Sequence, residues 1–209
     1  FHKDKNILCL ATKQETAKNM VTKVSFMYDN LPSWLKGNKP LEDNKLSLKL
    51  TNGSQIKAVS AASDAGRSEA VSLLIVDEAA FIENIAEIWA SAQQTLATGG
   101  GAIVLSTPYG TGNWFHKTWV SAESQENDFL PIKLPWYVHP ERDEAWRKKQ
   151  DELLGDPRLA AQECDCDFST SGDVVFYPEW LEFIKATTIK EPIERRGVDQ
   201  NLWVWESPD

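Results

Sequence analysis

Two apolar runs that do not alternate with polar residues most constrain how this chain can fold. Val71 to Val76 (VSLLIV) and Ala102 to Leu105 (AIVL) each end abruptly in polar residues. Strands that are apolar at consecutive positions are typical of a parallel sheet that helices cover on both faces. Between the runs, apolar residues recur at helical spacing over 85–96, and three glycines at 99–101 end that pattern. This order of strand, helix and strand predicts an α/β fold with a mostly parallel sheet.

The residues before these strands predict more of the same sheet. Asn6 to Thr12 (NILCLAT) is a short apolar run typical of a buried strand, and a helical pattern begins at Gln14. Lys45 to Ala61 places alternating residues around Thr51-Asn52-Gly53, which predicts an antiparallel hairpin with one solvated face. We expect further helices from about Gly112 and over 143–154 and 156–163.

The distribution of charge limits where nucleic acid can bind. The 209 residues carry a net charge of −9, but residues 1–50 hold nine lysines against five acidic residues, a net of +4. The remainder therefore carries −13, and a strongly acidic body is a poor platform for nucleic acid. Any DNA contact must come from a local basic face or from another part of the molecule. A hydrophobic content of 42% fits one large domain, or one domain with a small appendage.

Cysteine usage and the lack of a long apolar run bear on the compartment. The three cysteines are too few, and odd in number, for a disulfide framework, which fits a reducing cytosol. Cys164 and Cys166 lack the spacing of a zinc site, and we interpret them as small, half-buried residues on a strand. No run approaches the ~20 apolar residues of a membrane span, and no signal peptide is recognisable. We therefore expect a protein that is neither secreted nor held in a membrane.

Two adjacent acids, Asp77 and Glu78, follow the first apolar run directly. In phosphoryl transfer, one carboxylate at such a position holds Mg²⁺ and the next orients and deprotonates the attacking water. Neighbouring residues point in different directions where a strand ends, so each acid can take one of these roles. The alternatives are a strand end with solvated charges, or a helix start where the dipole favours acids.

Hydroxyl side chains follow the second apolar run. Ser106 and Thr107, with Pro108 after them, come one helix later than the acid pair. Because the carboxyl ends of neighbouring parallel strands share one edge of a sheet, we expect these hydroxyls to lie near Asp77 and Glu78. There they can hydrogen-bond a terminal phosphate or the attacking water. The alternative is an ordinary Ser/Thr–Pro turn.

Three blocks of sequence together resemble a known family. The large terminase subunits of tailed bacteriophages, the ATPase–nuclease motors that package DNA into procapsids, resemble this chain in LLIVDEAAF, IVLSTPYGTGNWF and AAQECDCDFSTSGDVVF. The order and spacing of the blocks make the resemblance specific, and it covers about Asn6 to Phe176. It implies a P-loop NTPase-like fold of the ASCE group, with a mostly parallel sheet flanked by helices and a small C-terminal helical lid.

The resemblance also implies roles for individual residues. Asp77 matches the Walker B magnesium ligand and Glu78 the catalytic glutamate. Ser106, Thr107 and Pro108 match the coupling motif, which senses the γ-phosphate and relays hydrolysis to movement. Arg67 matches an arginine that acts in trans on a neighbour's ATP, and a guanidinium suits that task. Its alternative is a surface salt bridge or loop anchor, and Ser68 stands where relatives often have glycine.

One expected motif is absent from the sequence. A packaging ATPase needs a phosphate-binding loop, yet the pattern GxxxxGK followed by Ser or Thr does not occur. By resemblance that loop precedes Phe1 and the nuclease acids follow Asp209, so we expect a central fragment that binds ATP weakly and does not hydrolyse it alone. The implied domains are a partial ATPase core over 1–138, a lid over 139–176 and a linker over 177–209.

Cofactors and partners follow from the same resemblance. It implies ATP and Mg²⁺ as cofactors, and double-stranded DNA, the portal protein and the small terminase subunit as partners. The motor would work as a homo-oligomeric ring in the cytoplasm of an infected bacterial host. Two alternatives stay open: a helicase-like translocase, which would need a late arginine motif, and a non-catalytic interaction module with a degenerate NTPase fold. A Walker A lysine in frame upstream favours the motor, and a start codon at Phe1 favours the module.

Overall fold

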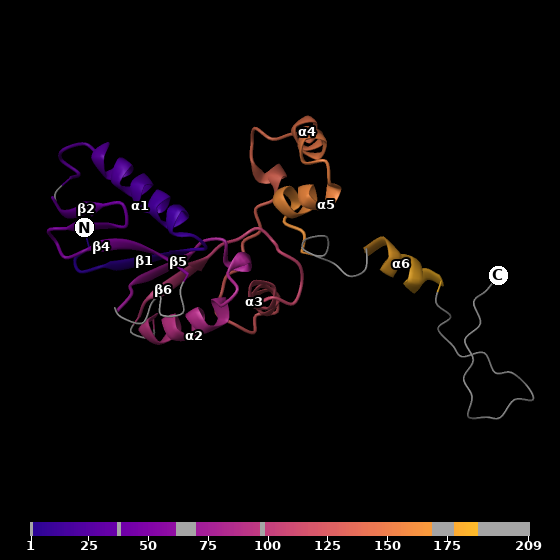
Figure 1. The fold of residues 1–209 in the computed structure, drawn as a ribbon, viewed down its shortest axis with the longest axis horizontal. Coiled ribbons are helices and arrows are strands. Elements are labelled where there is room, and N and C mark those ends of the chain that lie inside the picture. The colour runs from indigo at the N-terminus through magenta and orange to yellow at the C-terminus, as the bar shows by residue number, and fades with distance from the viewer. Residues whose placement is uncertain (1, 37–38, 62–69, 97–98, 169–177, 188–209) are drawn as a thin grey trace, which may run out of the picture. The chain divides into compact units, whose positions relative to one another are not determined.

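The chain forms a six-stranded sheet with helices on both faces (Figure 1). The computed structural model describes residues 2–36, 39–61, 70–96, 99–168 and 178–187. The strands lie in the order β2-β3-β4-β1-β5-β6. Their bounds are β1 Asn6–Ala11, β2 Pro40–Asn44, β3 Ser47–Leu50, β4 Gln55–Ser60, β5 Leu73–Val76 and β6 Gly101–Val104.

The centre of the sheet is parallel, as the apolar runs predict. β1 pairs in parallel with β4 and β5, and β5 pairs in parallel with β6. Val76 lies opposite Val104 in that last pair, so the strands before the acids and before the hydroxyls are direct neighbours. Burial on both faces of β5 is only partial. Leu74 and Val76 are buried, whereas Leu73 and Ile75 on the other face are half-buried.

The antiparallel hairpin also forms where Asn-Gly predicts it. β3 and β4 pair in an antiparallel ladder, and Gly53 in the turn has φ +83°, a backbone conformation that glycine adopts without steric cost. β2 adds a further antiparallel strand outside β3. Every residue of β2 is exposed, so the strand carries no alternating pattern that the sequence could reveal.

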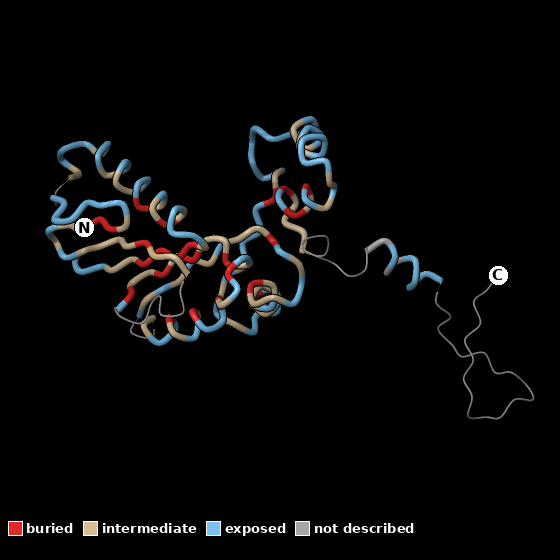
Figure 2. The backbone as a smooth tube through the Cα atoms, in the orientation of Figure 1, coloured by how far each residue is buried: buried red, intermediate tan, exposed pale blue. Residues whose placement is uncertain are grey.

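Helices cover the two faces of the sheet and form two apolar cores (Figure 2). α1 (Gln14–Asp29) packs on one face, where Ala17 and Val21 are completely buried against β1, β3 and β4. α2 (Ile85–Leu96) and α3 (Trp114–Glu123) cover the opposite face. There Ile88 and Phe115 pack with the apolar residues of β1 and β5. The predicted helices from Gln14, over 85–96 and from about Gly112 are therefore confirmed.

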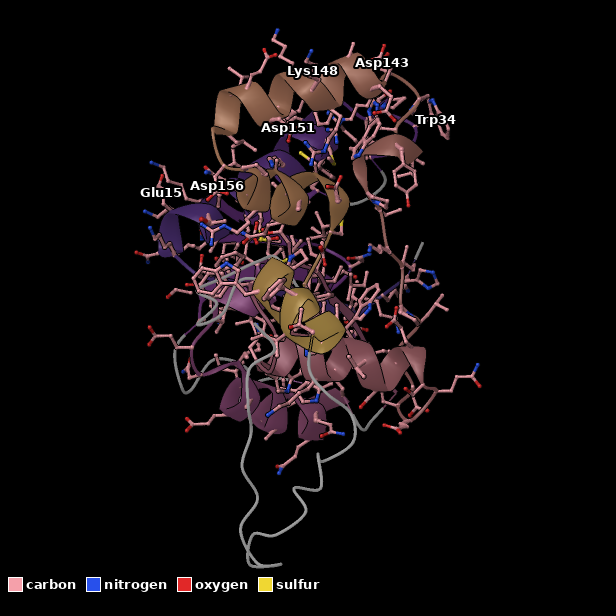
Figure 3. The ribbon with its side chains drawn as sticks, turned by 90° about the vertical axis from the view of Figure 1, so that its right-hand side faces the viewer. Glu15, Trp34, Asp143, Lys148, Asp151 and Asp156 are labelled. Carbon is pink, nitrogen blue, oxygen red and sulfur yellow. The ribbon has the colours of Figure 1, made fainter. Side chains whose placement is uncertain are left out.

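A small helical region follows the core along the chain. α4 spans Glu144–Leu154 and α5 spans Pro157–Ala160, and the side chains of Asp143 and Asp156 (Figure 3) accept hydrogen bonds at their N-termini. A π-helix, η3, follows over Ala161–Asp165. Our assignment of Cys164 and Cys166 to a strand is therefore wrong. The backbone stays helical through the first cysteine, and Cys166 ends the turn with φ 55°.

Residues 1–172 and 173–209 form two separate compact units. Within the second, the structure describes α6 (Pro178–Thr187). The strand-like LWVW run near the end of the chain lies outside the described residues, and the proposed domain limits at 138 and 176 stay predictions. Among the described helices, none combines the length and apolarity needed to cross a bilayer.

Candidate active site

The acid pair lies at the carboxyl end of β5, where the chain turns sharply. The Asp77 N–H still donates to the carbonyl of Leu10, which extends the pairing with β1 by one residue (2.9 Å). Glu78 then takes the left-handed conformation, with φ 54° and ψ 43°. For a residue with a Cβ this costs roughly 1–2 kcal/mol, which the surrounding packing must supply. The following 3₁₀ turn, η1 (Ala79–Phe81), begins with the fully buried Ala79 and so fixes the turn in the core.

The hydroxyl motif meets this turn from the end of β6. The Ala79 N–H donates to the Leu105 carbonyl (3.1 Å), and the Ala80 N–H donates to the Ser106 Oγ (3.1 Å). Ser106 therefore satisfies a backbone donor two residues after Glu78. The structure places Asp77, Glu78 and Ser106 at one rim of the sheet, with Thr107 half-buried and Pro108 buried beside them.

The environment of Glu78 disfavours its charged form. Burial raises the pKa of this carboxyl, and the negative charges of Asp77 and Glu163 raise it further. The Ser106 hydroxyl and the Thr107 backbone N–H approach the carboxyl group and act in the opposite direction, but the pKa remains above its usual value. The Oε2 atom is buried and accepts no hydrogen bond from the described residues. A carboxylate held in this way favours any ligand that brings a proton donor or a positive charge.

An aromatic contact joins the two loops of the site. The rings of Phe81, in η1, and Tyr109, after Pro108, lie 4.6 Å apart. The Tyr109 carbonyl accepts a hydrogen bond from the Asn113 side chain (2.6 Å), which also caps α3 by accepting from the His116 N–H. The coupling segment is therefore tied at one end to the acid turn and at the other to α3. Sequence analysis missed this link, because aromatic residues at these positions carry no periodic signal.

Glu163 is a second feature that the sequence did not predict. It lies on the π-helix η3, and its Oε1 accepts a hydrogen bond from the buried Gln162 side chain (2.9 Å). Phe168, just after η3, packs its ring against those of Phe115, His116 and Trp119 on α3. The quoted block AAQECDCDF contains both residues, but only the tertiary fold brings the charge of Glu163 to bear on Glu78.

Two further predictions have different outcomes. Arg67 lies outside the described residues, so the structure does not place it. In the described ranges, no group of three or more His, Cys, Asp or Glu side chains is arranged to hold a metal ion by itself. Asp77 and the orphaned Glu78 oxygen could supply part of a magnesium site, and further ligands would have to come from water and phosphate oxygens.

The sequence matches the family model of the terminase large subunit, T4-like-virus type, N-terminal, over residues 1–183. This chain belongs to the terminase large subunit family. The match extends beyond the three blocks quoted above and includes most of the first compact unit and α6.

Solved structures of phage terminases share the fold of this terminase chain. The large terminase ATPase domain of Thermus phage P74-26 is 21% identical with a TM-score of 0.61, and the match covers 80% of this chain and 78% of that one. A full large terminase from another thermophilic bacteriophage, solved in complex with ADP, has a TM-score of 0.62 at 10% identity, and the match covers 80% of this chain and 42% of that one. For the HK97 bacteriophage large terminase the values are 0.54 and 17%, with 81% and 36% covered. The matched region thus makes up less than half of the ADP-bound terminase and of the HK97 terminase.

Proposed function

We propose that this chain carries the hydrolytic part of the ATP site in a motor that drives double-stranded DNA into a viral procapsid. The observation that carries the proposal is the position of Glu78. Its strained backbone and half-buried, orphaned carboxylate lie at the carboxyl end of a parallel strand, where α/β folds bind their ligands. Family membership and the shared fold support a packaging ATPase over a helicase-like protein or a non-catalytic module.

Glu78 is the residue we assign to activation of the attacking water. General bases work best when their pKa lies near the working pH, and burial together with Asp77 and Glu163 moves the Glu78 pKa in that direction. The left-handed turn points this side chain away from the path of β5 while Asp77 continues it. We therefore assign Asp77 to the metal and Glu78 to the water. When bound, Mg²⁺ supplies positive charge that neutralises the phosphate oxygens.

Ser106, Thr107 and Pro108 are the residues we assign to coupling. Ser106 is hydrogen-bonded to the acid turn, and Tyr109 contacts Phe81 of that same turn. A shift at the terminal phosphate that moves Glu78 would therefore pull on the coupling segment and, through the Asn113 cap, on α3. This chain of contacts supports a relay from hydrolysis to movement.

The rest of the ATP site would come from outside these 209 residues. The sequence contains no phosphate-binding loop, whereas the thermophilic-phage terminase described above with ADP has also been solved with ATP-gamma-S. We propose that this chain alone binds ATP weakly and turns it over immeasurably slowly. Arg67 is proposed to reach a neighbouring subunit's ATP in a homo-oligomeric ring. Double-stranded DNA, the portal protein and the small terminase subunit are the proposed partners, in the cytoplasm of an infected bacterium.

The test is ATP hydrolysis by the longer terminase polypeptide that contains this chain. Glu78→Gln should lower kcat by about 100- to 10,000-fold, the usual contribution of a general base, while ATP binding is retained. Glu83→Gln removes an exposed carboxylate a few residues farther along the chain and should leave kcat unchanged. Equal losses in both variants, or full activity of Glu78→Gln, would refute the assignment.

A further inference from the structure

The free side of β6 is an unpaired edge beside the candidate site. The N–H groups of Gly101 and Leu105 donate to Ser72 and Val76 on the β5 side. Because backbone groups alternate in direction along a strand, those of Ala102 and Val104 point away from β5. No described strand pairs with them. An open, apolar strand edge of this kind is a template for another strand.

A second unpaired segment lies on the far side of that edge. In the run FLPIKLP over 129–135, Leu130, Ile132 and Leu134 are 80%, 63% and 69% exposed. Each proline holds the residue before it in an extended conformation. Phe129 packs against Trp89 of α2 (5.3 Å), so alternation places the three exposed residues toward the opposite face. The segment has the residue pattern of a strand without a partner.

This segment follows β6 in the same direction without pairing to it. At its start, Phe129 and Gly101 line one cavity of about 960 Å³. At its end, the Leu134 backbone N–H approaches the Cys166 thiol, next to the π-helix whose Glu163 acts on Glu78 at the end of β5. The segment therefore runs from the amino end toward the carboxyl end of the parallel strands. The two edges bound a slot, which we define by Ala102 and Val104 on one side and by residues 129–135 on the other.

The face above the slot is apolar and uncovered. Ala102 and Val104 pack toward α2 and α3, so Ile103 and Leu105 point to the face that carries α1. They are 50% and 43% exposed. The core that α1 forms involves β1, β3 and β4 but leaves this end of the sheet open. Together with the three exposed residues of 129–135, these side chains form an apolar surface of the kind that a helix covers.

We propose that a strand-then-helix unit from upstream of β1 in the same polypeptide fills this slot. Crossovers between parallel strands are right-handed. In this sheet the step from β5 to β6 carries α2 on one face, and the opposite step from β1 to β4 carries α1 on the other. A strand in the slot that leads back to β1 must therefore place its helix on the face of α1, over Ile103 and Leu105. The added strand lies parallel to β6, with apolar side chains on both faces.

The slot follows from geometry alone, and only a phosphate-binding role for the loop after the added strand rests on the proposed function. That loop would emerge at the carboxyl edge, beside Asp77 and Ser106. The backbone groups of Ala102 and Val104 would pair on one side. On the other side Leu130 and Ile132 would pair, because the prolines at 131 and 135 must face outward.

The experiment adds a synthetic peptide to the 209-residue chain and follows amide hydrogen exchange. The peptide comprises the ~30 residues encoded directly upstream of Phe1, the length of a strand, a helix and their loops. At 100 times its Kd, it should slow exchange at Ala102, Val104, Leu130 and Ile132 by about 100-fold. Ile132→Lys should abolish that protection, and Leu153→Lys, at an exposed position on α4, should not.

Three results would overturn the proposal: no protection, protection at the β2 edge instead, or a gene that begins at Phe1. The outcome is separable from the proposed function. Protection of both edges by a peptide that confers no ATP affinity keeps the strand and refutes the nucleotide site. ATP hydrolysis by the longer polypeptide with no protection at the slot keeps the function and refutes the strand.

Discussion

The charge state of Glu78 makes a sharp prediction about stability. Its carboxyl is half-buried, one oxygen has no hydrogen-bond partner in the described chain, and Asp77 and Glu163 repel its negative charge. An unpaired buried acceptor costs ~1–3 kcal/mol, and we take about 1 kcal/mol because the group retains some solvent. Glu78→Gln keeps the shape of the side chain and removes the charge. The variant should therefore have a free energy of unfolding about 1 kcal/mol higher near neutral pH.

The sign of the pH dependence follows from the raised pKa. Below the ordinary glutamate pKa of 4.5, the carboxyl is protonated in both the folded and the unfolded chain, and the substitution changes little. As pH rises through the higher folded pKa, the unfolded chain releases its proton first, and the wild type loses stability. The advantage of Glu78→Gln should therefore be small at about pH 3.5 and complete at about pH 7.5.

Urea unfolding of the 209-residue chain at these two pH values measures the effect. With a slope of about 2 kcal/mol per molar urea, a gain of about 1 kcal/mol moves the midpoint by roughly 0.5 M. Glu83→Gln, which removes an exposed carboxylate, supplies the control. A gain that is equal at both pH values would show that charge is not its origin. A loss of stability at neutral pH would refute our account of the site.

Two further substitutions test the local packing around the site. Ser106→Ala leaves a part-buried backbone N–H of the acid turn without its acceptor and should cost about 1–2 kcal/mol in urea unfolding, whereas Ser121→Ala, at an exposed hydrogen bond, should cost under about 0.5 kcal/mol; equal costs would contradict the role given to Ser106. Gly100→Ala would place a Cβ 2.4 Å from the Val71 carbonyl and should cost about 2 kcal/mol, and Gly101→Ala, whose Cβ meets nothing within 4 Å, should cost much less. Thermal unfolding of both glycine variants decides this, and matching melting temperatures would argue against the close approach of strand and loop.

Much of the core was predictable because its patterns are local. Non-alternating apolar runs identified β1, β5 and β6, helical spacing identified α1 and α2, and Asn-Gly identified the turn between β3 and β4. The edge strand β2 was not predictable, since pairing with β3 rather than burial holds its exposed residues. Cys164 was misassigned because three alternating residues, Cys-Asp-Cys, imitate a strand although the backbone there is still helical.

The sequence by itself determined the sheet, the pair of acids and the hydroxyls that follow the next strand, because period and motif spacing are properties of neighbouring residues. Only the tertiary structure decided how these groups meet. The left-handed backbone of Glu78 and the bond from Ala80 to Ser106 depend on a buried turn between two strands. The influence of Glu163 and the slot beside β6 depend on segments far apart in the chain. Such features arise from packing and from the direction of crossovers, and neither leaves a signal in adjacent residues.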